Sequence, residues 1–171
     1  FNTAWYLKQY NADISVSYFT GLGTDAISNK LRDAISGADI STEYVIEVPD
    51  RTVGLYLISL EYGERSFSYW RAQSAARQLA AHPGDLDRAM KLADLIYYSG
   101  ITLAILDEQS RSNLLGALER ARAQGKTVAF DTNIRPRLWA SPTEMTSVIM
   151  RAAAQSDIVL PSYDDEAEWF G

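Results

Sequence analysis

The second half of the chain alternates short apolar segments with longer helical patterns, and this alternation restricts the possible folds more than any other feature. Residues 95–99, 127–131 and 158–160 are short and apolar, as buried strands are. Helical patterns precede, separate and follow them, at residues 85–93, 107–124, 142–154 and 164–170. The alternation predicts a doubly wound α/β fold, with a mostly parallel sheet and helices on both of its faces.

The first half of the chain interrupts this alternation with a predicted β-hairpin. Residues 51–60 and 65–71 are β-rich and flank a turn at 61–64. An antiparallel pair does not fit easily into a parallel sheet, so we expect residues 43–71 to contribute a small β lid outside the core. The other elements expected in this half are strands at 14–19 and 43–48 and helices at 2–10, 25–36 and 73–81.

The second strand of this hairpin has a basic and aromatic face. Read with a period of two, residues 65–71 place Arg65, Phe67, Tyr69 and Arg71 on one side. An arginine matches a carboxylate or phosphate with its planar fork, and a tyrosine adds a flat surface with one hydroxyl. An ordinary exposed strand with scattered aromatics is the alternative. A second basic and aromatic segment at residues 131–139 favours a site for a small anionic ligand.

Composition narrows the class of protein. The 171 residues suffice for one domain with a sizeable core, and 47% of them are hydrophobic with a mean hydropathy of −0.17. A net charge of −6 argues against nonspecific nucleic-acid binding. The sequence has no cysteine, which suits a reducing cytoplasm, and no apolar run near the roughly 20 residues of a membrane span. Any anion site must therefore be a local arginine cluster in an acidic protein.

The fold class predicts where a ligand would bind. In open α/β sheets, ligands bind at the carboxyl ends of the strands. Those ends are expected at residues 99–101, 131–133 and 161–162. A lid carrying Tyr69 and Arg71 over such a crevice would close on a small substrate.

One short motif favours a different function. Gly21, Gly23 and Ala26 formally fit the G-x-G-x-x-A fingerprint of dinucleotide-binding proteins, with Glu43 or Glu47 near the expected acidic position. The chain then turns into a hairpin rather than a βαβ unit. An NAD-binding Rossmann oxidoreductase is therefore kept as an alternative function.

Several longer motifs carry a family resemblance that covers residues 1–171. They are Phe1-Asn-Thr-Ala-Trp-Tyr-Leu7, Gly21-Leu-Gly-Thr-Asp25, Gly54-Leu-Tyr-Leu-Ile-Ser59, Gly63-Glu-Arg-Ser-Phe-Ser-Tyr-Trp-Arg-Ala-Gln-Ser-Ala-Ala76, Asp131-Thr-Asn-Ile-Arg-Pro-Arg-Leu-Trp139 and Leu160-Pro-Ser-Tyr-Asp-Asp-Glu-Ala167. In this order they resemble the ribokinase-like carbohydrate kinases, and among them most closely the 2-keto-3-deoxygluconate kinases (2-dehydro-3-deoxygluconokinases). We expect the chain to be an internal piece of such a kinase domain, truncated at both ends.

The resemblance implies a reaction and a set of site residues. The reaction is ATP-dependent phosphorylation of 2-keto-3-deoxygluconate to its 6-phosphate with Mg²⁺, in the Entner–Doudoroff route or sugar-acid catabolism. The residues implied in substrate binding are Tyr56, Tyr69, Trp70, Arg71, Ile101 and Arg135. Those implied near the ATP phosphates are Arg71, Asn133 and Arg135. Lids in this family also often contribute to a dimer contact, which implies a homo-oligomer.

Two departures from the family pattern limit this assignment. The family's N-x-x-E motif aligns with residues 162–165, so Asp165 is the candidate to hold a metal-bound water. Charge at the start of a helix would explain the same acidic residues. The segment with the catalytic base is expected beyond residue 171, so no catalytic residue is assigned and the chain alone is expected to be inactive. Fructokinase and a non-catalytic sugar-acid-binding module remain as further alternatives.

Overall fold

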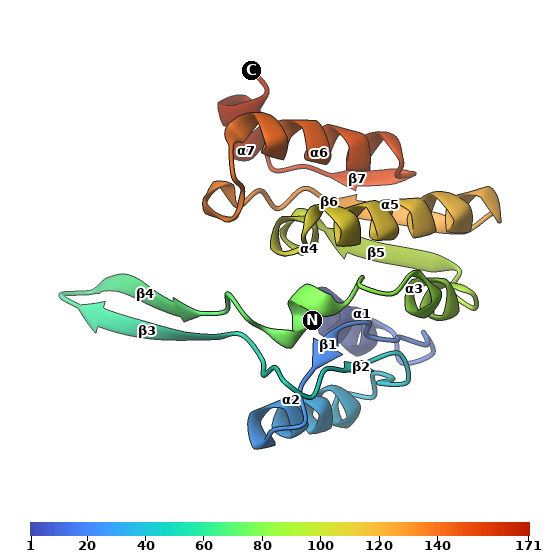
Figure 1. Ribbon diagram of the computed structural model, residues 1–171, viewed down its shortest axis with the longest axis horizontal. Coiled ribbons are helices and arrows are strands. Elements are labelled where there is room, and N and C mark those ends of the chain that lie inside the picture. The colour runs from blue at the N-terminus through green and yellow to red at the C-terminus, as the bar shows by residue number, and fades with distance from the viewer. The chain divides into compact units, whose positions relative to one another are not determined.

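The computed structural model describes residues 1–171 and divides the chain into two compact units, Phe1–Leu79 and Ala80–Gly171. Each unit is described by itself. Figure 1 shows the elements of both units, with the hairpin extending away from the remainder of the first. None of the helices is long and apolar enough to cross a membrane.

The second unit contains a three-stranded parallel sheet, as the sequence predicts. Strands β5 (Leu95–Ser99), β6 (Thr127–Asp131) and β7 (Ile158–Leu160) pair in the order β5-β6-β7 (Figure 1). The helices of this unit are α3 (Pro83–Met90), α4 (Gly100–Ile105), α5 (Glu108–Ala123), α6 (Pro142–Ala154) and α7 (Tyr163–Trp169). Because parallel neighbours need a crossover connection, α4 and α5 join β5 to β6, and α6 joins β6 to β7.

The strands of this sheet differ in burial. Phe130 is fully buried and stacks on Tyr98 at a centroid distance of 4.8 Å. The Tyr98 hydroxyl donates to the carbonyl of Ala152, so α6 lies on this face. Val128, Ala129 and Phe130 of the central strand are buried, whereas large apolar side chains of β5 and β7 stay exposed: Leu95, Tyr97, Ile158, Val159 and Leu160.

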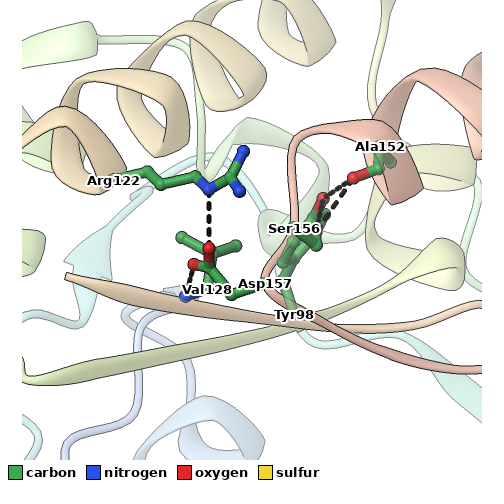
Figure 2. A network of polar contacts seen from close by, with 6 residues as sticks. All are labelled: Tyr98, Arg122, Val128, Ala152, Ser156 and Asp157. Atoms are coloured by element: carbon green, nitrogen blue, oxygen red, sulfur yellow. Dashed lines mark hydrogen bonds and ion pairs between the residues drawn. The ribbon is translucent and has the colours of Figure 1, made fainter. Parts of the chain in front are cut away.

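A polar network ties the helices to the strands of this sheet (Figure 2). The Asp157 carboxylate accepts from the backbone N–H of Val128 at 2.9 Å and from Arg122 Nε at 2.7 Å. These contacts, the backbone bond first, lower the pKa of the Asp157 carboxyl. Ser156 lies beside Tyr98, and both hydroxyls contact the carbonyl of Ala152. The network fixes the end of α5 and the start of β7 against β6.

The first unit has a smaller parallel pairing and its own core. Strands β1 (Gly21–Leu22) and β2 (Ile46–Glu47) pair in parallel, and the helical elements are α1 (Asn2–Tyr10), α2 (Ala26–Gly37) and the 3-10 turn η1 (Ala75–Gln78). The buried core consists of Leu22, Ile35 and Ile40.

Strand pairing in this unit is shorter than predicted. Residues 14–19 form no strand and make only an isolated bridge, between Ser17 and Ser41. The ladder breaks because residues 42–45 form a turn, closed by the backbone N–H of Val45 donating to the carbonyl of Thr42. Pairing resumes where Ile46 donates to the carbonyl of Thr20. The predicted helix at 73–81 is likewise reduced to the short 3-10 turn.

Two helix boundaries in the second unit also differ from the prediction. Pro83 and Gly84 start α3 instead of separating two helices, because proline at the first helical position loses no intrahelical hydrogen bond. The predicted long helix is preceded by α4, which the sequence analysis missed. Its six apolar and small residues lack the polar positions that reveal an amphipathic helix.

The predicted hairpin is confirmed. Strands β3 (Leu55–Glu61) and β4 (Glu64–Trp70) pair antiparallel, and every residue of both strands is exposed. Tyr62 and Gly63 form the tip with φ values of 52° and 85°. Positive φ at both central positions is the conformation of a type I′ turn, which matches the twist of a two-stranded ribbon.

Candidate functional site

The first group of predicted site residues lies on one face of the hairpin. Tyr56 pairs with Tyr69, and Ile58 pairs with Phe67. Directly opposite residues share a face, so these side chains form one surface. The Phe67 and Tyr69 rings stack at 6.0 Å, and the Tyr56 ring lies 6.2 Å from each of them. The predicted alternation of residues 65–71 thus produces an aromatic platform.

Arg71 extends this platform with a positive charge. Its guanidinium carbon lies 4.2 Å from the centre of the Tyr69 ring, within the range of a cation–π interaction. Such stacking uses the face of the guanidinium plane and leaves the N–H groups at its edge able to bind a carboxylate or phosphate. The structure therefore brings Tyr56, Tyr69 and Arg71 together.

Trp70 lies on the other face of the hairpin. It pairs with Leu55 and alternates with Tyr69 along the strand, so its side chain points away from the aromatic platform. Leu57 shares its face, and all three side chains are exposed. Trp70 therefore does not share a face with Tyr69 and Arg71. Its substrate role remains a prediction.

The second group of predicted residues lies at the carboxyl ends of β5 and β6. Ser99 pairs with Asp131, so the two strands end at the same level. Asn133 Nδ2 donates to Ser99 Oγ at 3.0 Å, and Asn133 has a φ of 33°, in the positive range where asparagine is enriched. A Cβ on Gly100 would lie 2.0 Å from the carbonyl oxygen of Thr132, so only glycine allows this approach. The predicted meeting of these two strand ends is confirmed.

Three polar residues at these ends were not assigned from the sequence. Ser99 holds Asn133, and Tyr97 donates from its hydroxyl to Asp131 at 2.8 Å. The Thr132 hydroxyl is buried and makes no hydrogen bond. Only the positions of these three residues in the sequence could have indicated a role. All three lie at or beside the carboxyl ends of strands, where open α/β sheets bind ligands. Ile101, a predicted substrate residue, is half-buried in the first turn of α4.

Arg135 begins the segment 135–139, called here the Arg135 segment, whose far end contacts Arg111. Its Nη1 donates to the carbonyl of Ile134 at 2.7 Å, and the 3-10 turn η2 (Pro136–Leu138) follows. The guanidinium carbon of Arg111 lies 5.1 Å from the centre of the Trp139 ring. Arg111 in turn pairs with Glu144.

The anchor is an ion pair between Arg111 of α5 and Glu144 of α6. Arg111 Nη1 donates to Glu144 Oε1 at 2.6 Å, and the backbone N–H of Ala140 donates to Glu144 Oε2 at 3.2 Å. The hydrogen bond from Arg111 lowers the pKa of the Glu144 carboxyl. Ser141 caps α6 by accepting from the Glu144 N–H. The Arg135 segment is thereby tied to two helices.

A pocket of about 170 Å³ adjoins this anchor. Its lining residues are Glu108, Arg111, Ser112, Glu144, Val148 and Arg151. None of the predicted site residues lines it, and its arginine at position 111 is already paired with Glu144. The hairpin of the first unit and the strand ends of the second therefore remain two separate candidate sites.

Asp165 lies in the first turn of α7, beside Asp164 and Glu166. No group of three or more histidine, cysteine or acidic side chains is arranged to hold a metal ion. Mg²⁺ in kinases is usually held by one or two carboxylates together with substrate phosphates and water. A single carboxylate fits that mode, so the metal role of Asp165 remains a prediction.

The glycines of the dinucleotide-like motif serve the chain's own packing. A Cβ on Gly23 would lie 1.9 Å from the carbonyl oxygen of Arg51, and one on Gly21 would lie 2.4 Å from that of Ala75. Glycine is therefore needed at both positions to let neighbouring backbone approach. Asp25 caps α2 and accepts from Ser28 Oγ and N–H, which lowers its pKa to about 2. Packing and capping thus account for the residues of this motif, and nothing here adds support to the NAD-binding alternative.

Parallel strands joined by helices, with polar residues gathered at the strand ends, place the chain among α/β proteins that bind ligands at that edge of the sheet. The sequence profile of the pfkB family carbohydrate kinases matches residues 1–171. The chain therefore belongs to the pfkB family of carbohydrate kinases. This confirms the resemblance found in the sequence.

Curated relatives within this family include enzymes of two kinds. The chain is 37% identical to a 2-dehydro-3-deoxygluconokinase of Haemophilus influenzae and 39% identical to one of Escherichia coli K12, over 96% and 99% of its length. It is 29% identical to a fructokinase of Vibrio alginolyticus over 84% of its length. It covers 54%, 57% and 45% of these three proteins, so it spans about half the length of the relatives it matches.

Solved structures show the same fold. A 2-dehydro-3-deoxygluconokinase of Thermotoga maritima matches 99% of the chain with a TM-score of 0.85 and 24% identity. A sugar kinase of Pyrococcus horikoshii in complex with ATP matches 99% of the chain with a TM-score of 0.83 and 19% identity. The chain covers 51% and 54% of these two proteins.

Proposed function

We propose that the protein containing this chain is an ATP-dependent sugar-acid kinase that phosphorylates 2-keto-3-deoxygluconate to its 6-phosphate. The hairpin face carries the proposal, because it presents the Arg71 guanidinium on the Tyr69 ring. A keto sugar acid has a carboxylate, which a guanidinium binds with two parallel hydrogen bonds, and hydroxyls, which tyrosines can bind. The identities of 37% and 39% to 2-dehydro-3-deoxygluconokinases support the same substrate.

The strand-end residues supply groups for the phosphoryl donor. Asn133 and Arg135 are proposed to contact the ATP phosphates, and Arg71 to stabilise the transferring phosphoryl group. Such transition states need positioning and positive charge more than covalent chemistry. Asp165 is proposed to hold a water of the Mg²⁺ ion that accompanies ATP. Because the chain spans about half of its relatives, the base that accepts the hydroxyl proton is assigned to no residue here.

The second face of the hairpin is proposed as a contact between copies of the protein. Leu55, Leu57 and Trp70 are exposed there, at 42%, 55% and 62%. A two-stranded hairpin is marginally stable by itself in water, and burial against a second copy would stabilise it. We place this enzyme in the cytoplasm, where its proposed co-substrate ATP is available.

Fructokinase is the second candidate, favoured by the 29% identity to the Vibrio alginolyticus enzyme. A protein of full family length that contains these residues, called here the family-length protein, separates the two. We expect its kcat/KM for 2-keto-3-deoxygluconate to exceed that for fructose by ~100-fold or more, because fructose lacks the carboxylate. A coupled assay of ADP release with each sugar measures this ratio. Turnover of fructose without turnover of the keto acid would refute the substrate assignment.

A further inference from the structure

Gly54 and Arg71 face each other at the base of the hairpin. Leu55 pairs with Trp70, so the next position outward on each strand brings Gly54 opposite Arg71. Backbone hydrogen bonds fix this base: the N–H of Ala75 donates to the carbonyl of Thr52 at 2.8 Å, and Ser74 donates to Arg71 at 3.2 Å. Arg71 therefore leaves the hairpin at a point where the backbone is restrained.

A side chain at position 54 would collide with this restrained point. A Cβ on Gly54 would lie 2.9 Å from the Cβ of Arg71 and 3.4 Å from the Cβ of Ser74. Neither neighbour is the flexible end of a side chain, and Ser74 is buried at 8% exposure. Gly54 does not have a positive φ, so glycine is needed here for space and not for backbone conformation. An alanine would have to push the Arg71 backbone away.

The opposite side of Arg71 is also supported. Its guanidinium lies on the Tyr69 ring, which itself stacks on Phe67. The Cβ of Arg71 thus lies close to Gly54, which has no side chain, and its guanidinium lies on the Tyr69 ring. Displacing the base would tilt the guanidinium off the ring.

We propose that Gly54 is a positioning residue that directs Arg71 toward the carboxylate of the substrate. The inference rests on the proposed sugar-acid kinase function and extends it to a residue that makes no substrate contact. Small displacements of a positioned group are costly, since a shift of about 1 Å can reduce rates ~100-fold. Gly54 acts through Arg71 and so affects discrimination of acidic from neutral sugars, and not the binding of ATP.

The test compares Gly54→Ala with Gly37→Ala in the family-length protein. Gly37 is the matched control, because a Cβ there would meet nothing within 4 Å and its φ is not positive. We expect Gly54→Ala to raise the KM for 2-keto-3-deoxygluconate ~10-fold and leave the KM for ATP within about twofold. Gly37→Ala is expected to change neither. An equal rise in both KM values, or none in either, would overturn the inference.

A double-mutant cycle with Arg71→Ala shows whether the effect passes through the arginine. If Gly54 positions Arg71, Gly54→Ala adds nothing once Arg71 is removed, whereas additive effects would contradict the proposal. Loss of keto-acid binding in Arg71→Ala but not in Gly54→Ala would reject this inference alone. An Arg71→Ala enzyme with unchanged keto-acid kinetics would reject the proposed substrate site itself. Should Gly54→Ala be less stable, its kinetics are measured at a temperature at which circular dichroism shows it folded, and the same selective, non-additive rise in the KM for the keto acid is required.

Discussion

The hairpin and the three-stranded sheet present their candidate site residues on different kinds of support. In the sheet, Phe130 and Val128 are fully buried, and the strand-end residues follow directly from this rigid interior. In the hairpin, every residue of both strands is exposed, and Tyr69 and Arg71 lie on an aromatic platform without a core beneath it. The sheet therefore holds its candidate site residues on a buried interior, whereas the hairpin holds its own through local contacts between neighbouring side chains.

The contrast is sharpest for two phenylalanines. Phe130→Ala removes a buried ring and leaves a cavity, so we expect the free energy of unfolding of the family-length protein to fall by about 3–5 kcal/mol. Phe67→Ala, at a site 46% exposed, is expected to cost less than about 1 kcal/mol. Urea denaturation monitored by circular dichroism measures both. Equal losses would mean that the hairpin is as integral to the core as β6.

Arg71→Ala reverses the contrast, because it is expected to affect binding without affecting stability. Loss of charge-assisted hydrogen bonds to a carboxylate should lower kcat/KM for 2-keto-3-deoxygluconate by about 100-fold. Arg65→Ala is the matched control, since Arg65 lies on the same face toward the tip, opposite Leu60, and is not among the residues implied in substrate binding. Steady-state kinetics and thermal melts of both variants provide the check. A large kinetic effect of Arg65→Ala would shift the proposed site toward the tip.

Arg111→Met is expected to affect both stability and binding, because it weakens an anchor of the Arg135 segment. The variant leaves the Glu144 carboxylate without its cation, and we expect a loss of about 1–2 kcal/mol in the free energy of unfolding. The KM for ATP should rise more than the KM for the sugar acid, since Arg135 is proposed to contact the phosphates. A protein that loses stability but keeps both KM values would show that the anchor is purely structural.

The smallest effect is expected in acid, at the cap of α2. The pKa of Asp25 is lowered from its ordinary value to about 2 by its bonds to Ser28, so the charged form stabilises the folded state. That contribution is complete above the unfolded pKa near 4 and is lost as the pH falls toward 2. Asp25→Asn should flatten the dependence of the urea midpoint on pH in this window. An unchanged acid slope would show that other carboxylates, Asp157 and Glu144 among them, govern it.

The sequence was sufficient for features set by local pattern. Short apolar strands between helices gave the parallel sheet, and Tyr62-Gly63 between β-rich runs gave the hairpin and its aromatic face. The helical pattern predicted at residues 142–154 has the bounds of α6. These features depend on residues close together in the chain, where periodicity and capping chemistry decide the structure.

Features set by contacts distant in sequence were missed. The break in the β1–β2 pairing depends on a turn at 42–45 that shortens a ladder with residues 16–22. The Arg111–Glu144 ion pair joins two helices, and nothing local marks either residue as a partner. The need for glycine at position 54 arises only when Arg71 is folded back against it. The family motif grouped Trp70 with Tyr69 and Arg71 as substrate residues. In a pleated strand, adjacent residues point to opposite faces, so Trp70 lies on the other face of the hairpin.

The exposed hairpin also has a consequence for the timing of a catalytic cycle. Isolated β-hairpins form in about 1–10 μs, whereas kinases typically turn over about 1–100 times per second. If β3 and β4 separate while no second copy covers them, they should therefore re-pair within a small fraction of one turnover. In the uncovered hairpin we expect amides to exchange with deuterium before those of β6, and re-pairing of the strands not to limit kcat.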